Sequence, residues 1–198
     1  MKEESKGKRI LMCVLGVVLY LVFVYGIECL GYISAFGWIA AIPLSAFLAA
    51  GPIMLVETRI RKPGAYILFG VLWLVLSFTT GMVWNASGPV IIIVLTAAAE
   101  IIRRALGYEK KKAYILSYLP ASLFILGQYI YVWTSTDRYI EEAIAEMGGE
   151  AYGIALRGYA TAGGLILVIL ASLALGCVGA VLSAKVLKIE ANSNKVLR

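Results

Sequence analysis

Long apolar segments, separated by short polar or charged connections, are the feature that most constrains this chain. Each has roughly the 20 residues that a helix needs to cross the hydrocarbon core of a bilayer. Helices are favoured there because lipid offers no partner for unpaired backbone groups. Only 15% of the 198 residues are charged, against about 25% in soluble domains. We therefore predict an all-α, polytopic membrane protein.

The apolar segments predict six transmembrane helices in a single domain covering residues 1–198. The expected spans are 10–27, 32–56, 65–83, 89–102, 113–133 and 159–184. Pro43 and the Gly51-Pro52 pair are expected to kink or break the second span. The connection 134–158 is mildly amphipathic. It predicts either a short helix over the mouth of the bundle, capped by Thr136 or Asp137, or a solvated loop.

The placement of basic residues predicts the orientation. All but two of the 18 Lys and Arg lie before the first span, after the sixth, or in the connections after the second and fourth. The exceptions are Arg138 and Arg157. Because basic connections stay in the cytoplasm, we expect an even number of spans and both termini cytoplasmic. The net charge of +6 is then a topology signal and does not indicate nucleic-acid binding.

Several classes of membrane enzyme are excluded by missing motifs. The chain has no histidine, which removes HExxH metalloproteases and disfavours a transition-metal site. It has no GxxxxGK[ST] motif, so it cannot itself hydrolyse ATP by the usual route, and it has no GxSxG motif. We expect no catalytic residue, no metal and no cofactor.

Three acidic residues lie nearest the membrane: Glu28, Glu57 and Glu100, each at the end of a span. Such a residue is either an interfacial charge in contact with water or a functional group. The interfacial interpretation is the simpler one for all three.

Polar and aromatic side chains gather at the predicted outer ends of the spans. They form either an aromatic belt at the membrane interface or an outward pocket for a small, flat, polar molecule. An aromatic belt does not require the amide side chains of Asn85 and Gln128, which favours the pocket. The candidate substrate-binding residues are Glu28, Tyr32, Trp84, Asn85, Gln128, Tyr129, Trp133 and Arg138.

Small residues recur along one face of the sixth span, at Ser172, Gly176, Gly179 and Ser183. Small side chains let two helices approach closely. The expected use is packing inside the bundle, with an intersubunit contact as the alternative.

Several short motifs occur in a characteristic order. They are Gly51-Pro52-Ile53-Met54, Arg61-Lys62-Pro63-Gly64, the basic link 108–112, Gly127-Gln128-Tyr129 leading to Trp133, and Asp137-Arg138-Tyr139 before an acidic loop. In order and spacing the chain resembles the MptD-like (Trep_Strep) group of energy-coupling-factor (ECF) transporter S components. The resemblance covers almost the whole chain.

The resemblance implies a six-helix subunit that binds a vitamin-like micronutrient at the outer face and has no ATPase activity. The implied partners are a membrane coupling protein and two ATP-binding-cassette subunits, besides the substrate and the lipid bilayer. S components often carry an Ala-x-x-x-Ala face on helix one. Here Cys13 and Gly16 occupy that region and are the expected partner contacts. The alternative function is a stand-alone small permease or channel, which would be expected to show an inverted repeat.

Overall fold

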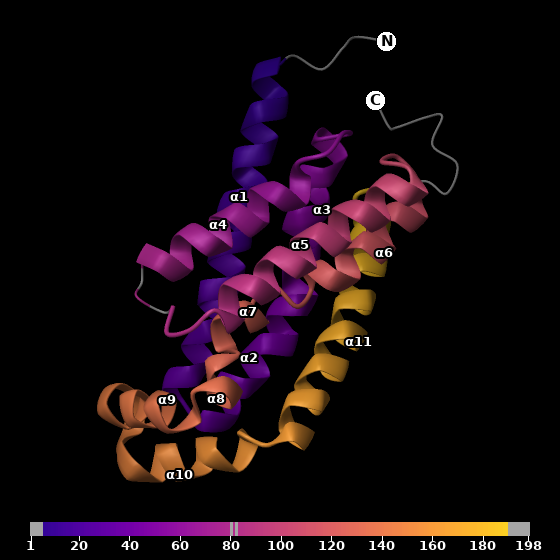
Figure 1. Cartoon of the computed structure of the whole chain (residues 1–198). Coiled ribbons are helices and arrows are strands. Elements are labelled where there is room, and N and C mark those ends of the chain that lie inside the picture. The colour runs from indigo at the N-terminus through magenta and orange to yellow at the C-terminus, as the bar shows by residue number, and fades with distance from the viewer. Residues whose placement is uncertain (1–5, 80, 82, 190–198) are drawn as a thin grey trace.

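A computed structural model describes residues 6–79, 81 and 83–189, and the elements assigned in them are all helical (Figure 1). The α-helices and two shorter helical turns follow one another along the chain. They are α1 (Lys6–Glu28), the 3-10 turn η1 (Cys29–Tyr32), α2 (Ala35–Leu48), α3 (Ala50–Arg59), α4 (Ala65–Thr79), α5 (Ser87–Leu106), α6 (Lys111–Ala121), α7 (Leu126–Tyr129), α8 (Tyr131–Thr134), α9 (Thr136–Ala143), the π-helical turn η2 (Ile144–Gly148), α10 (Gly149–Tyr159) and α11 (Ala162–Val186).

Among the described residues, three stretches are long and apolar enough to cross a membrane: Lys6–Tyr32, Ala35–Arg59 and Ala162–Val186. They coincide with the first, second and sixth predicted spans. Helix α4 is apolar but has only 15 residues, and residues 80 and 82 of the predicted third span lie outside the described residues. Helix α5 has 20 residues, but Glu100, Arg103 and Arg104 interrupt its apolar character. The total of six spans stays a prediction.

The second predicted span is divided into α2 and α3, but its backbone stays helical at the joint. Pro43 lies inside α2. The joint between α2 and α3 is at Ala49, whose φ of −65° and ψ of −18° are still helical. Pro52 stands in the first turn of α3, where its missing N–H costs little.

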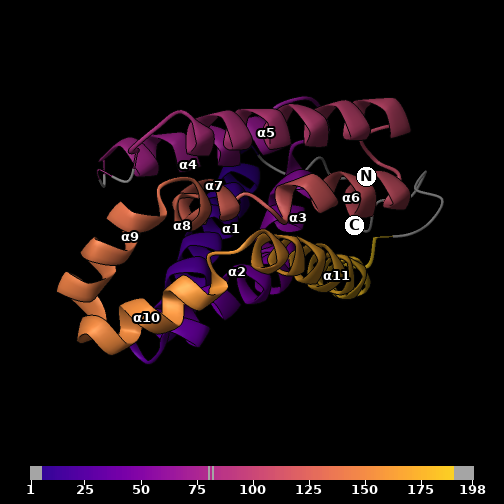
Figure 2. The same ribbon diagram turned by 60° about the horizontal axis from the view of Figure 1, so that its bottom comes forward.

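The fifth predicted span, expected as one helix, is divided into α6, α7 and α8. Pro120 near the end of α6 removes a backbone donor, and the chain continues through i→i+3 turns, with Leu123 N donating to Pro120 O at 3.1 Å. Figure 2 shows this segment between the α4–α5 layer and helices α2 and α11. Irregular backbone at membrane depth is tolerated where protein surrounds it, and Phe124, Tyr129 and Tyr131 are fully buried.

The helices pack around this buried segment. Helix α2 packs against α11, α1 against α3, and α5 against both α4 and α6. Large apolar side chains remain exposed on the outward faces of α1, α4, α5 and α11, including Val18, Val71, Val94 and Leu170. Exposed apolar patches of this kind mark a membrane-facing surface.

The small residues of α11 are used inside the chain. A Cβ atom on Gly176 would lie 2.6 Å from Ser122 Cβ, and one on Gly179 would collide with the carbonyl oxygen of Phe47 in α2. Ser172 is fully buried. The prediction of close packing within the bundle is confirmed for these residues.

The two ends of the molecule differ in charge. The start of α1 and the end of α11 lie together at the top of Figure 1, whereas α9 and α10 lie at the bottom. We call these the inner and outer ends, following the predicted orientation. At the outer end, Arg138 pairs with Glu142 at 3.3 Å and Arg157 pairs with Asp137 at 2.9 Å. Both outer arginines therefore have acidic partners.

Candidate functional site

A helical cap lies across the outer end of the bundle. It consists of α9, η2 and α10, and it packs on α2 and η1 (Figures 1 and 2). The chain turns at Gly149, whose φ of +71° suits glycine. Gly153 lets α10 approach η2, because a Cβ there would lie 2.5 Å from Ile144 Cγ1. Helices α9 and α10 lie in the connection 134–158, so the short-helix prediction is confirmed and the solvated-loop alternative is wrong. The predicted cap by Thr136 or Asp137 is wrong, because the residue that precedes α9 is Ser135, and its side chain makes no capping hydrogen bond.

Two tyrosines fasten the cap to the membrane helices. Trp38 Nε1 donates a hydrogen bond of 2.7 Å to Tyr139 Oη. Tyr152 Oη donates to the carbonyl oxygen of Gly31 at 2.9 Å. Burial raises the pKa of Tyr152 to about 12, so its hydroxyl keeps the proton that it donates. The hydrogen bond from Tyr152 therefore stabilises the folded cap fully below about pH 10, the ordinary pKa of tyrosine. This stabilisation is lost as the pH rises through about 12, the pKa of Tyr152 in the folded protein.

We expect Tyr152→Phe to loosen the cap while leaving the bundle folded. Losing one hydrogen bond and leaving Gly31 O unpaired costs about 1–2 kcal/mol. Amide hydrogen exchange should therefore accelerate in residues 136–159 and stay unchanged in α11. Tyr32→Phe is the matched control, because Tyr32 is 68% exposed. Equal exchange in wild type and Tyr152→Phe would show that this bond does not hold the cap.

Aromatic rings from distant segments meet beneath the cap. Trp84 lies 5.4 Å from both the Tyr131 and Tyr139 rings, and the Arg138 guanidinium stands 4.7 Å above Trp84. Trp38 stacks on Tyr129 with centroids 4.8 Å apart. The sequence prediction had not included Trp38, Tyr131 or Tyr139 among the site residues.

Among the described residues under the cap, Glu28 and Tyr129 are buried and have polar atoms without a hydrogen-bond partner. Glu28 is 8% exposed and Tyr129 is fully buried. Within the part of the chain that the structure describes, neither Glu28 Oε1 nor Tyr129 Oη has a hydrogen-bond partner. Glu28 is close enough to interact electrostatically with both Tyr129 and Tyr139. Glu28 is therefore mostly shielded from water, which differs from the expected interfacial charge.

Two other candidates hold the structure together. Asn85 Nδ2 donates to Ser135 Oγ at 2.9 Å, and Asn85 Oδ1 accepts from the Ser87 amide at 2.8 Å. Trp133 Nε1 donates to Tyr159 O at 3.2 Å, which ties α8 to the end of the cap. Gln128 is half-buried. Tyr32 is 68% exposed.

Of the expected partner contacts on α1, Gly16 is buried and Cys13 is half-buried. Gly16 is buried against α3, since a Cβ there would lie 2.6 Å from Val56 Cγ2. This leaves Gly16 no exposed surface for another subunit. Cys13 is half-buried and packs against the core.

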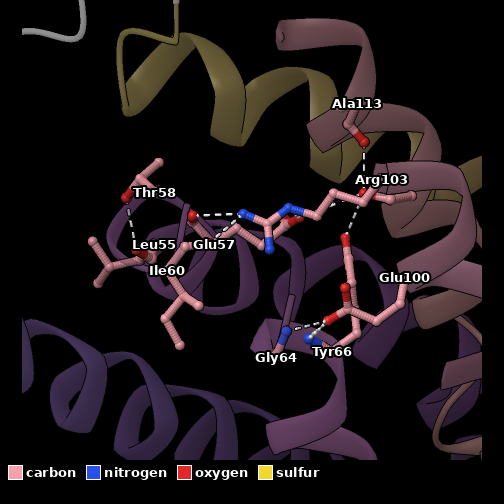
Figure 3. Close-up of polar contacts among 10 residues, drawn as sticks. Leu55, Glu57, Thr58, Ile60, Gly64, Tyr66, Glu100, Arg103 and Ala113 are labelled. Atoms are coloured by element: carbon pink, nitrogen blue, oxygen red, sulfur yellow. Dashed lines mark hydrogen bonds and ion pairs between the residues drawn. The ribbon is translucent and has the colours of Figure 1, made fainter. Parts of the chain in front are cut away.

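At the inner end, Glu57 and Arg103 form an ion pair of 3.2 Å with both side chains fully buried (Figure 3). Arg103 Nη2 also donates to the carbonyl oxygens of Glu57 and Ile60, at 2.8 and 2.7 Å. The Tyr108 and Tyr114 rings flank the guanidinium, with centroids at 5.2 and 5.7 Å. Arg103 thus caps the last carbonyls of α3. The expectation that Glu57 contacts water is wrong.

Glu100, also on α5, caps the start of α4. Its Oε1 accepts hydrogen bonds of 3.0 Å from the backbone amides of Gly64 and Tyr66 (Figure 3). These amides begin α4 and have no partner within their own helix. The contacts of this inner cluster join α5 to α3 and to the start of α4, so we assign the cluster a structural role.

Comparison with known proteins identifies the family. A family model described as a hypothetical bacterial integral membrane protein (Trep_Strep) matches residues 7–189. No curated protein and no solved structure matches the chain. The family description and the apolar helices place the protein in the bacterial cell membrane as a multi-pass protein. This chain therefore belongs to the Trep_Strep family of bacterial integral membrane proteins.

Proposed function

We propose that this protein is the substrate-binding subunit of an ECF-type importer. It captures a small, vitamin-like micronutrient at the outer end. A membrane coupling protein and two ATP-binding-cassette subunits then supply the energy for uptake. The subunit itself is not an enzyme and carries no cofactor. The proposal extends the family assignment by the resemblance of the motifs to S components.

The observation that carries the proposal is the closed cap over an aromatic cluster containing unpaired Glu28 Oε1 and Tyr129 Oη. Leaving a buried polar atom unpaired costs about 1–3 kcal/mol, so such atoms call for an explanation. Binding sites for small molecules combine apolar and aromatic walls with a few convergent polar groups. Glu28 and Tyr129 supply the polar groups, and Trp38, Trp84 and Tyr139 supply the walls.

Co-purification separates this function from a stand-alone permease or channel. We expect an affinity-tagged chain, extracted from native membranes in mild detergent, to bring down ATP-binding-cassette subunits identifiable by peptide sequencing. An importer subunit needs them, because no ATP-binding motif occurs in its own sequence. Uptake by liposomes containing this chain alone, with no ATPase subunit recovered from cells, would contradict the proposal.

We expect Trp84→Ala to lower the amount of bound small molecule at least tenfold. The change removes the ring that contacts Tyr131, Tyr139 and Arg138, and stacking contacts of this kind contribute about 0.5–1.5 kcal/mol each. The measurement is the small-molecule content of purified protein by mass spectrometry. Phe78→Ala is the control, since Phe78 is 63% exposed on α4. Unchanged content in Trp84→Ala would mean that the cluster is only an interfacial belt.

A further inference from the structure

The chemistry of the two unpaired groups under the cap restricts what they can bind. A carboxylate accepts hydrogen bonds and attracts positive charge. A buried carboxylate is costly unless a cation or several donors satisfy it. The phenol of Tyr129 can accept one hydrogen bond and donate another.

Within the described residues, no Lys or Arg forms an ion pair with Glu28. The arginines of the outer end, Arg138 and Arg157, pair with Glu142 and Asp137 and are 60% and 57% exposed. Glu57, a fully buried acid of α3, has Arg103 at 3.2 Å. The contrast indicates that Glu28 is free to meet a charge that comes from outside the chain.

The surroundings of Glu28 restrict the shape of the bound molecule. The Tyr129 and Trp38 rings pack on each other, and the indole N–H of Trp38 donates a hydrogen bond to the Tyr139 hydroxyl. These rings give flat, apolar surfaces next to the Tyr129 hydroxyl, and Glu28 is close enough to interact electrostatically with Tyr129 and Tyr139. A planar molecule can lie against such a surface, and a cation gains from the ring faces as well.

We propose, on the basis of the function above, that Glu28 and Tyr129 bind a small planar molecule bearing a protonated amine, amidine or amino-substituted ring. Glu28 accepts hydrogen bonds from the nitrogen donors and neutralises their charge. Tyr129 adds one further hydrogen bond. The cap residues Tyr139 and Tyr152 close the site over the bound molecule.

The test uses matched probes on the purified full-length protein in detergent. Benzamidine and adenine carry the predicted donors, and benzoate and purine are their counterparts without the amidine or the amino group. Binding is followed by tryptophan fluorescence, with probes up to 10 mM. We expect the donor-bearing member of at least one pair to bind at least tenfold more tightly than its counterpart. We also expect this preference to disappear in Glu28→Gln, which keeps the shape of the side chain and removes its charge.

Tyr129→Phe provides a second variant, which keeps the Trp38 stack and should weaken the same probe severalfold. Equal binding of both members of each pair, or an unchanged preference in Glu28→Gln, would overturn the inference. Binding of no donor-bearing probe by a folded wild type would overturn it too. Recovery of ATP-binding-cassette subunits is measured separately, so the importer assignment can stand when this ligand class fails.

Discussion

Replacing Arg103 by methionine is expected to destabilise the folded protein by about 3–5 kcal/mol, the usual cost of removing one partner of a buried ion pair. The variant leaves the Glu57 carboxylate fully buried without its cation. It also removes the donors to Glu57 O and Ile60 O, which end α3. The resulting loss should appear as a lower melting temperature in detergent and a low yield of monodisperse protein.

Arg61→Met is the matched control for Arg103→Met. Arg61 pairs with Glu109 at 3.4 Å, but these side chains are 47% and 46% exposed. Exposed pairs contribute about 0–1 kcal/mol, so this variant should behave like wild type. Similar melting temperatures for the Arg103→Met and Arg61→Met variants would show that the buried pair does not hold α3 to α5.

Gly179→Leu is expected to prevent close packing of α11 on α2. Even a Cβ atom at this position would collide with the backbone carbonyl of Phe47, and backbone cannot move aside as a flexible side chain can. Overpacking typically costs about 1–3 kcal/mol and can cost more. We expect reduced expression and aggregation in size-exclusion chromatography.

Gly163→Leu is the control for Gly179→Leu, because it makes the same substitution in α11 at a position without a close neighbour. Gly163 lies in the first turn of α11, and the nearest atom to its Cβ would be Thr161 Oγ1 at 4.0 Å. This variant should remain monodisperse. A fully monodisperse Gly179→Leu protein would refute the close contact between α11 and α2.

The sequence predicted the helical class and most helix positions, because apolar length is a local property. The spans at 10–27 and 159–184 correspond to α1 and α11 within a few residues. The division of 113–133 was missed, although Pro120 gave a signal. An apolar segment has the same kind of sequence whether lipid or protein surrounds it. Only the tertiary structure shows that the segment 113–133 is surrounded by protein.

The cap illustrates a different limit. The amphipathic pattern around Ile140 and Ala143 predicted α9, whereas three glycines between 149 and 158 masked α10. Glycine lowers helix propensity by about 1 kcal/mol relative to alanine. Here Gly153 is required by contact with Ile144. The four-residue spacing of buried Tyr152 and Leu156 was the available sign of a helical face.

Candidate site residues could be selected by position at the outer ends but not ranked. Glu28 and Glu57 look alike in the sequence, as acids at span ends, yet one has a buried arginine partner and the other has none. Arg103 is 46 residues away from Glu57, so no local sequence pattern predicts that the two residues pair. Similarly, Trp38 joins the site through Tyr139, which lies 101 residues further along the chain.

The most direct test of the capture function is mass spectrometry of small molecules released from the detergent-purified, full-length protein. We expect wild type to release one compound of vitamin-like size in near-equimolar amount. The Trp84→Ala protein should release at least tenfold less, while Phe78→Ala matches wild type. Release of no compound from wild type, or equal amounts from wild type and Trp84→Ala, would contradict substrate capture beneath the outer cap.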